Sequence, residues 1–295
     1  MAKNPREIRR RIKAVDNTRQ ITRAMELVAR TKMQRTQQQV AAARPYNEAL
    51  TDTMWRLVRR RGADGVASDL LARRPVDRCL LMCFSADRGL CGGYNANILR
   101  ATQRQLEELE DLDDVRLITV GRRSRDFFRW RGVDLYDEFT NIGEEADLSL
   151  AQNLGRIAMR EFSAERVDEV RIVYTEFESV FSHPTKVMRL LPIAEPEVAD
   201  DEGGSARATY LYEPSAEYIL KTLVPRYVNN SLYKVLTEAK ASEHAARVTA
   251  MKNATDNAGD LIEDLTRQFN RARQAVITRE ISEIASGAEA LAQQR

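Results

Sequence analysis

The chain has 295 residues, of which 43% are hydrophobic and 31% charged, with a formal net charge of +2. This composition allows one ordinary core and an extended charged surface. No apolar run is long enough to span a bilayer, and no apolar stretch follows the basic N-terminus as it would in a secretory signal. Three cysteines, an odd number, favour a reducing compartment. We therefore expect a soluble intracellular protein.

The first part of the chain predicts one very long helix over residues 1–61. No proline or glycine lies between Arg6 and Arg44, and the helical pattern can continue after Pro45 to Arg61. Asn4 is a suitable cap and Pro5 suits the first helical position. Residues at intervals of three, four or seven form a narrow stripe typical of a coiled coil: Ile8, Ile12, Val15, Thr22, Met25, Ala29 and Met33.

This N-terminal stretch is also strongly basic. Residues 1–44 carry twelve Lys and Arg against three Asp and Glu, whereas residues 213–295 carry eleven of each kind. Two interpretations of the basic helix remain open: a solvated face, or an electrostatic track for an acidic partner, either protein or nucleic acid.

Residues 62–212 predict a compact α/β domain. Strand signals at 78–84, 115–120, 133–136, 169–176 and 186–191 are interleaved with helix signals at 95–109, 122–130 and 148–162. Alternating strands and helices favour a mostly parallel, Rossmann-like sheet. Two segments, 62–76 and 195–208, are expected to be loops.

Residues 213–295 predict a second long helix. No proline follows Arg226, and a stripe weakened by small residues runs along it: Val248, Met251, Ala258, Leu261, Leu265, Phe269, Ala272 and Val276. At a rise of 1.5 Å per residue the two terminal helices would reach roughly 85 and 110 Å. A middle domain of about 150 residues has a radius of gyration of only ~15 Å. An antiparallel pair of such helices must overhang the domain, which suggests a shaft, a tether or an arm.

The turn at 85–95 is the one glycine-rich candidate for a phosphate site. It follows a strand and precedes a helix, but Gly89, Gly92 and Gly93 form neither GxxxxGK[ST] nor GxGxxG. We interpret these glycines as allowing a tight strand-to-helix turn. Within the turn, Asp87 and Arg88 are expected to form a local ion pair.

The remaining residues contain no pattern that predicts a catalytic site or a metal-binding site. His183 and His244 are expected in a loop and in the long helix, without cysteines at ligand spacing. Cys79, Cys83 and Cys91 lack a fourth zinc ligand and are interpreted as buried thiols. We expect neither a metal nor a cofactor, and no catalytic residue.

Three separated stretches resemble one protein family. Residues 8–29, IRRRIKAVDNTRQITRAMELVA, resemble the opening of the gamma chain of F-type ATP synthase. DRGLCGGYN at 87–95 is similar to the central motif of that family, and residues 242–284 resemble its C-terminal signature. Arg30 and Thr31 depart from the small residues that the family commonly has, and the 195–208 segment lacks the cysteine pair of the chloroplast type.

The resemblance implies a central rotor shaft that couples proton translocation to ATP synthesis or hydrolysis without catalysing a reaction itself. The implied partners are the alpha and beta subunits of the catalytic ring, the epsilon subunit and the membrane c-ring, with no nucleic acid. The implied location is peripheral, on the cytoplasmic face of the bacterial inner membrane. By resemblance, Met25 faces a partner loop, and the C-terminal contact set comprises Arg247, Gln274, Thr278 and Glu280.

Two other classes of function make different predictions. A nucleotide-binding enzyme would bind ATP tightly as an isolated chain, although the phosphate-loop lysine is missing. A coiled-coil arm that binds nucleic acid would show an affinity that falls steeply with salt. Low aromatic content (6%) and the lack of a base-stacking motif argue against this second alternative.

Overall fold

The computed structural model describes residues 4–61, 69–193 and 216–292. Two helices account for almost half of the chain: α1 (Pro5–Arg61) and α5 (Ala216–Ala292). The contacts divide the chain into two compact units, Met1–Val28 with Val248–Arg295, and Ala29–Arg247. The division into 1–61, 62–212 and 213–295 remains a prediction.

The start of α1 follows its sequence signals. The Asn4 side chain accepts a hydrogen bond from the Arg6 amide at 3.0 Å, and Pro5 is the first helical residue, where its missing N–H costs nothing. Glu7 binds Arg11 at 2.9 Å, one turn further along. The helix continues through Pro45, as predicted.

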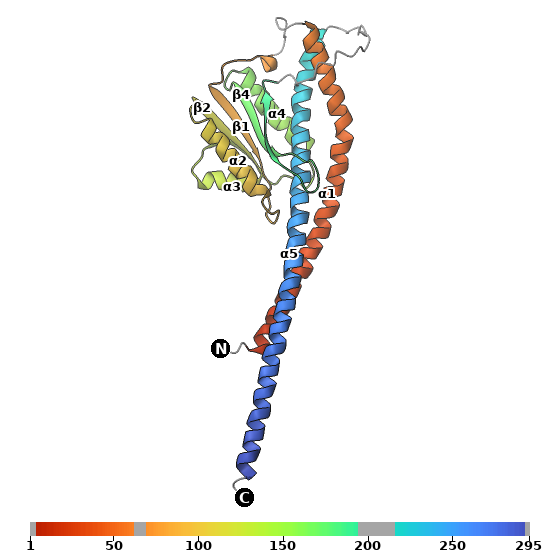
Figure 1. Ribbon diagram of the computed structural model, residues 1–295. Coiled ribbons are helices and arrows are strands. Elements are labelled where there is room, and N and C mark those ends of the chain that lie inside the picture. The colour runs from red at the N-terminus through yellow and green to blue at the C-terminus, as the bar shows by residue number, and fades with distance from the viewer. Residues whose placement is uncertain (1–3, 62–68, 194–215, 293–295) are drawn as a thin grey trace. The chain divides into compact units, whose positions relative to one another are not determined.

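The Ala29–Arg247 unit contains a five-stranded sheet in the order β3-β2-β1-β4-β5 (Figure 1). The strands are β1 (Arg78–Phe84), β2 (Asp114–Val120), β3 (Leu135–Phe139), β4 (Glu169–Thr175) and β5 (Thr185–Leu191). The first four are parallel and β5 pairs antiparallel with β4. The predicted mostly parallel α/β domain between two long helices is thus confirmed.

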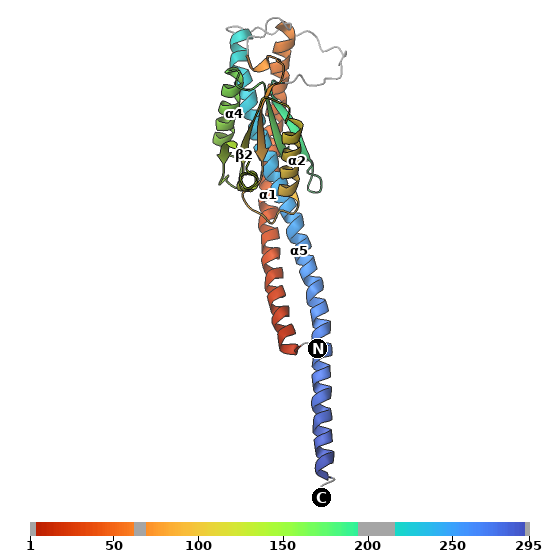
Figure 2. The same ribbon diagram turned by 90° about the vertical axis from the view of Figure 1, so that its left-hand side faces the viewer.

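The two faces of the sheet bury different partners because side chains alternate along each strand. Leu80, Met82 and Phe84 of β1 join the larger core with α4 (Leu148–Ser163), α1 and α5. Leu81 and Cys83 face the smaller core with α2 (Tyr94–Glu108) and α3 (Arg122–Trp130). Figure 2 shows the sheet between α4 and α2.

The third strand begins two residues later than expected. Val133 was assigned to this strand, but its amide donates to the Phe128 carbonyl at 3.0 Å and so belongs to the end of α3. Gly132, with φ +74°, reverses the chain there. A 3-10 helix, η2 (Asp69–Leu71), lies in the described part of the expected 62–76 loop. The expected 195–208 loop lies outside the described residues.

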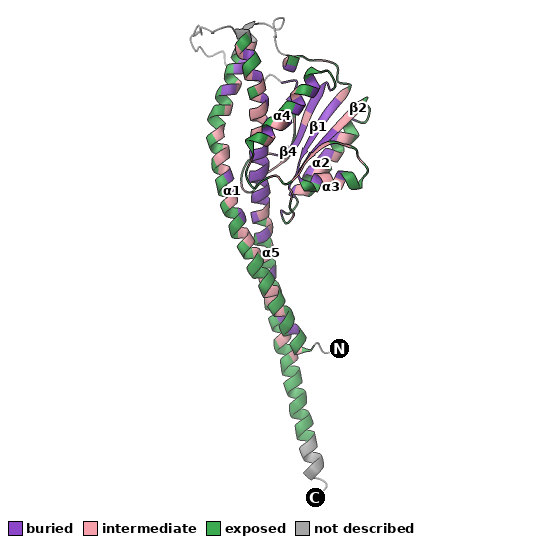
Figure 3. Cartoon of the chain, turned by 180° about the vertical axis from the view of Figure 1, so that it is seen from behind, coloured by how far each residue is buried: buried purple, intermediate pink, exposed green. Residues whose placement is uncertain are grey.

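Burial along α5 decreases toward its C-terminal end (Figure 3). Every residue from 235 to 246 is buried, although this segment includes Thr237, Glu238, Lys240, Ser242, Glu243 and His244. Every residue from 273 to 286 is exposed. Within the described residues, none of the helices is long and apolar enough to cross a membrane.

Candidate functional site

The glycine-rich turn connects β1 to α2 through residues 85–93. Gly92 has φ +56° and Leu90 has φ +61°, two left-handed conformations in close succession. Gly93 caps α2 with φ −81°, which any residue adopts, and a Cβ at Gly89 would lie 2.9 Å from the mobile guanidinium of Arg123. Of the three glycines singled out in the sequence, Gly92 is therefore the one whose backbone favours glycine.

Hydrogen bonds within the protein hold this turn in place. Asn95 accepts from the Ala86 amide at 3.0 Å and donates to the Arg88 carbonyl at 3.3 Å. The Asp87 carboxylate accepts from the amides of Arg122 and Asn141, at 2.9 and 3.2 Å. The expected ion pair between Asp87 and Arg88 is wrong, because Asp87 caps α3 while Arg88 pairs with Glu144 at 3.3 Å.

A fourth glycine, which the sequence interpretation did not single out, constrains the same region. Gly121 follows β2 with φ +107°, and a Cβ there would lie 2.2 Å from the carbonyl oxygen of Ser85. The two chain segments approach closely, and the Ser85 hydroxyl donates to the Ser124 hydroxyl at 2.8 Å. The only hint in the sequence was its position between a strand and a helix, where a close approach cannot be foreseen.

A small cavity lies beside the turn. The cavity lined by Ser85, Tyr94 and Glu243 has a volume of about 10 Å³, close to that of a single water probe. The Gly89 carbonyl accepts a hydrogen bond from Arg247 at 3.4 Å. These contacts support the interpretation that the glycines serve folding.

A buried charge network lies where α5 passes this turn. Glu243 accepts from Arg247 at 2.7 Å and from Lys240 at 3.2 Å, and all three side chains are at most 12% exposed. Burial by itself raises the pKa of Glu243, but Lys240 and Arg247 outweigh it and hold the pKa below its ordinary value. The network is therefore ionised and fixes α5 against the turn.

Glu144 extends the network to a second helix. Its carboxylate contacts Lys32 of α1 at 3.0 Å and Arg88 of the turn at 3.3 Å, and its backbone carbonyl lies 3.3 Å from the Nε2 atom of His244. Burial lowers the pKa of His244, so its imidazole is neutral at pH 7. One short connection before α4 thus touches α1, the turn and α5.

Arg247, predicted as a partner contact, belongs to this network. Its guanidinium reaches Glu243, the Gly89 carbonyl and, at 3.4 Å, the Nδ1 atom of His244. These internal contacts account for its position, and a contact with another subunit stays a prediction.

The helix pair of the other unit contains Met25. Its two helices are joined by a hydrogen bond of 2.8 Å between the hydroxyls of Thr22 and Thr255. Ile8, Val248, Met251, Ala258 and Leu265 are buried in this unit, and Met25 is half-buried. Leu261, which was placed in the stripe, is 48% exposed although its spacing from the buried Ala258 and Leu265 is that of the stripe. Met25 thus lies at the edge of the seam.

The other predicted contact residues lie on the bare end of α5. Gln274, Thr278 and Glu280 are all exposed, as are Ile277, Ile281 and Ile284, which follow each other at helical spacing and are 45%, 60% and 72% exposed. The three isoleucines form an apolar stripe that, among the described residues, nothing covers. An apolar stripe of this kind marks an interaction surface.

The three cysteines are free and buried, as expected. Burial raises the pKa of the Cys79 and Cys83 thiols to about 12 and also raises that of Cys91. Within the described residues, no group of three or more His, Cys, Asp and Glu side chains is arranged to hold a metal ion.

Comparison with known proteins covers nearly the whole chain. The family model described as ATP synthase matches residues 4–291. The "ATP synthase gamma chain" of Pelotomaculum thermopropionicum is 44% identical over 97% of this chain and 98% of its own length. That of Moorella thermoacetica is 46% identical over the same shares.

Solved structures share the fold at lower identity. A chain of the Euglena gracilis mitochondrial ATP synthase, in a structure of its OSCP, F1 and c-ring, aligns with a TM-score of 0.66 and 18% identity, covering 97% of this chain and 94% of that one. A chain of the Tetrahymena thermophila mitochondrial ATP synthase central stalk and c-ring aligns with a TM-score of 0.60 and 22% identity, covering 79% and 99%. On the sequence matches, the chain belongs to the family of ATP synthase gamma chains.

Proposed function

We infer that this chain is the central rotor shaft of an F-type ATP synthase, coupling proton translocation through a membrane sector to ATP synthesis or hydrolysis at a catalytic ring. The observation that best supports this function is the difference in burial along the helix α5. Every residue over 235–246 is buried, whereas every residue over 273–286 is exposed. The buried part packs within the α/β domain, and the exposed part presents an apolar stripe that a partner subunit would cover.

The proposed mechanism requires no bond chemistry in this chain. A shaft presents different faces to identical catalytic subunits. The free energy of its contact therefore differs from one subunit to the next. Because a partner shifts a conformational equilibrium only by its differential affinity for the states, the asymmetry of the shaft is the functional quantity. The basic N-terminal helix beside a charge-balanced C-terminal helix supplies such asymmetry.

The buried network supports a second part of the proposal. Torque applied to a helix is transmitted only if the helix cannot turn within the domain that holds it. Glu243, Lys240 and Arg247 are fixed by ion pairs in a buried setting, and the Tyr94 hydroxyl donates to the Ala239 carbonyl at 3.1 Å. We propose that these contacts prevent α5 from rotating against the α/β domain.

The proposed partners are the alpha and beta subunits around the bare end of α5, and the epsilon subunit and c-ring at the α/β domain. The proposed location is the cytoplasmic face of the bacterial inner membrane, as a peripheral part of the complex. Met25, Arg247, Gln274, Thr278 and Glu280 are the proposed contacts within the catalytic ring.

Two measurements test this proposal. Purification of the tagged chain from its own cells should recover the other synthase subunits in fixed stoichiometry. Hydrogen exchange of residues 273–286 should be fast in the isolated chain and slow in the assembled complex. Equal exchange in both states would show that no ring encloses this segment.

A further inference from the structure

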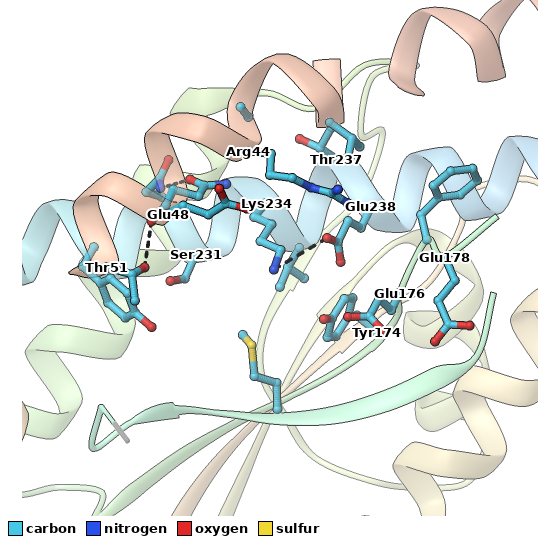
Figure 4. A pocket seen from close by; sticks show the side chains of 18 of the residues that line it. Arg44, Glu48, Thr51, Tyr174, Glu176, Glu178, Ser231, Lys234, Thr237 and Glu238 are labelled. Atoms are coloured by element: carbon cyan, nitrogen blue, oxygen red, sulfur yellow. Dashed lines mark hydrogen bonds and ion pairs between the residues drawn. The ribbon is translucent and has the colours of Figure 1, made fainter. Parts of the chain in front are cut away.

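A second feature of the Ala29–Arg247 unit has no part in the rotor mechanism: a pocket between α1, α5 and the end of β4. Its volume is about 640 Å³, within the range of pockets that hold small organic molecules. Figure 4 shows Arg44 and Glu48 of α1, Lys234 and Glu238 of α5, and Tyr174 and Glu176 from β4 and the residue after it, around this space.

The floor of the pocket contains a carboxylate with an unused oxygen. Glu238 is 6% exposed, and its Oε1 atom lies 3.8 Å from the Lys234 ammonium. Its Oε2 atom is buried and accepts no hydrogen bond from any described residue. Burial, together with the negative charge of Glu176, raises the pKa of this carboxyl despite Lys234. The Tyr174 hydroxyl lies beside this carboxyl and favours its charged form, but Oε2 can still accept a further hydrogen bond from a molecule in the pocket.

The charge of the lining indicates the sign of that partner. Five carboxylates line the pocket (Glu48, Asp52, Glu176, Glu178 and Glu238) against two cations, Arg44 and Lys234. Lys186, which is outside the lining, pairs with Glu176 and Glu178. An excess of negative charge remains after that pairing, which favours a cationic ligand and disfavours an anion.

The walls indicate what the cation is attached to. Tyr174, Phe177 and Tyr227 line the pocket together with Met188. Aromatic rings and a thioether favour an apolar body, and ring faces also attract ammonium groups. A bare metal ion would gain nothing from these walls.

We propose that this pocket binds a small organic amine, with its ammonium group donating to the Oε2 atom of Glu238 and its apolar body against the three aromatic rings. Lys234 reaches the same carboxylate from the rim, where its side chain is 50% exposed. It is therefore displaced or shared when the amine enters.

The test uses the full chain and 2-phenylethylamine as the probe, in calorimetric titrations at pH 7. Its neutral and anionic analogues are 2-phenylethanol and 3-phenylpropanoate. The amine should bind about tenfold more tightly than the alcohol, because a charge-assisted hydrogen bond is replaced by a neutral one. The carboxylate should bind more weakly than both. Equal affinities for amine and alcohol would overturn the proposal.

Three variants locate the site. Glu238→Gln should weaken amine binding about tenfold while the affinity for the alcohol stays the same. Lys234→Met removes the competing ammonium and should tighten amine binding, a gain that damaged folding cannot produce. Lys252→Met, an exposed lysine of α5 outside the lining, is the matched control and should change nothing. Amine binding that is insensitive to both pocket variants would overturn the assignment.

Amine binding to the assembled synthase shows whether the natural occupant of the pocket is a free amine or a side chain of a partner subunit. The amine should bind the purified complex as tightly as it binds the isolated chain. Loss of binding on assembly would overturn the free-amine assignment, because a subunit surface would then cover the pocket.

Discussion

Neutralising Glu243 tests whether the buried network holds α5 in place. Glu243→Gln leaves two cations unpaired, Lys240 and Arg247, whose side chains are only 9% and 12% exposed. Removing one partner from a buried ion pair costs about 3–5 kcal/mol, and the partial exposure of Arg247 places the expected loss near the lower value.

The chain supplies a matched control on the same helix. Glu263 and Arg267 have the same residue types and the same spacing of four, but their side chains are 73% and 62% exposed and 3.7 Å apart. Exposed pairs contribute about 0.2–1 kcal/mol, so Glu263→Gln should change stability by less than about 1 kcal/mol. Arg267 also pairs with Asp264 at 2.7 Å, so Glu263→Gln leaves no cation unpaired, whereas Glu243→Gln leaves two buried ones.

Urea unfolding followed by far-ultraviolet circular dichroism measures both variants, because α5 contributes helical signal to both units. Tryptophan fluorescence adds a report on the unit that holds Glu243, since Trp55 lies in its core and is 6% exposed. The double variant Glu243→Gln/Arg247→Met should recover part of the stability, because one unpaired cation is also removed. Equal losses from Glu243→Gln and Glu263→Gln would refute the reasoning, since burial would then make no difference.

Three further substitutions have defined outcomes. Gly92→Ala should lower the free energy of unfolding by about 1 kcal/mol because φ is +56°, whereas Gly93→Ala, at φ −81°, should cost less; thermal melts compare the two. Glu161 is 1% exposed, and Arg166 holds its pKa at about 2, below the ordinary 4.5, despite the opposing effect of burial. Because this pKa is depressed on folding, its stabilisation of about 2 kcal/mol is complete above pH 4.5 and is lost as the pH falls to about 2. The stability difference between the wild type and Glu161→Gln, measured by urea titrations across that window, should shrink on acidification; a constant difference would contradict it. Met25→Lys should leave assembly intact but lower the protons pumped per ATP, since the proposed contact of residue 25 with a partner loop, if that loop is acidic, gains an ion pair that must break at each step; unchanged pumping in reconstituted vesicles would count against this contact.

The sequence alone predicted those elements whose signals come from residues close together in the chain. The β1 strand at 78–84 was predicted with its observed bounds because a short apolar run between polar residues has few alternatives. The Asn4 cap and the unbroken α1 helix likewise depend on residues close to one another. The third strand was misplaced because Val133 suits a strand by composition but is bound to the end of α3.

Long-range contacts limited the prediction of the site. The stretch 235–246 looks like a solvated helix face in the sequence, because six of its residues are polar, yet all twelve positions are buried. This segment contacts β4 through Ser242, α2 through Ala239 and the connection before α4 through His244, which periodicity within α5 cannot reveal. The family resemblance suggested Arg247 as a partner contact, which stays a prediction, while its internal bonds to Glu243 and the Gly89 carbonyl became visible only in three dimensions.

The protection of the cysteines has a practical consequence for studies of rotation. Thiol reagents attack the thiolate, and Cys79 and Cys83 have pKa values of about 12 and no exposed surface. Cys91, 1% exposed, also has a raised pKa. A cysteine introduced at an exposed position outside the proposed ring contacts, such as Phe181 at 92% exposure, would be the fast-reacting thiol in the folded chain. A fluorophore or bead could thus be attached at one chosen point while all three native cysteines are kept.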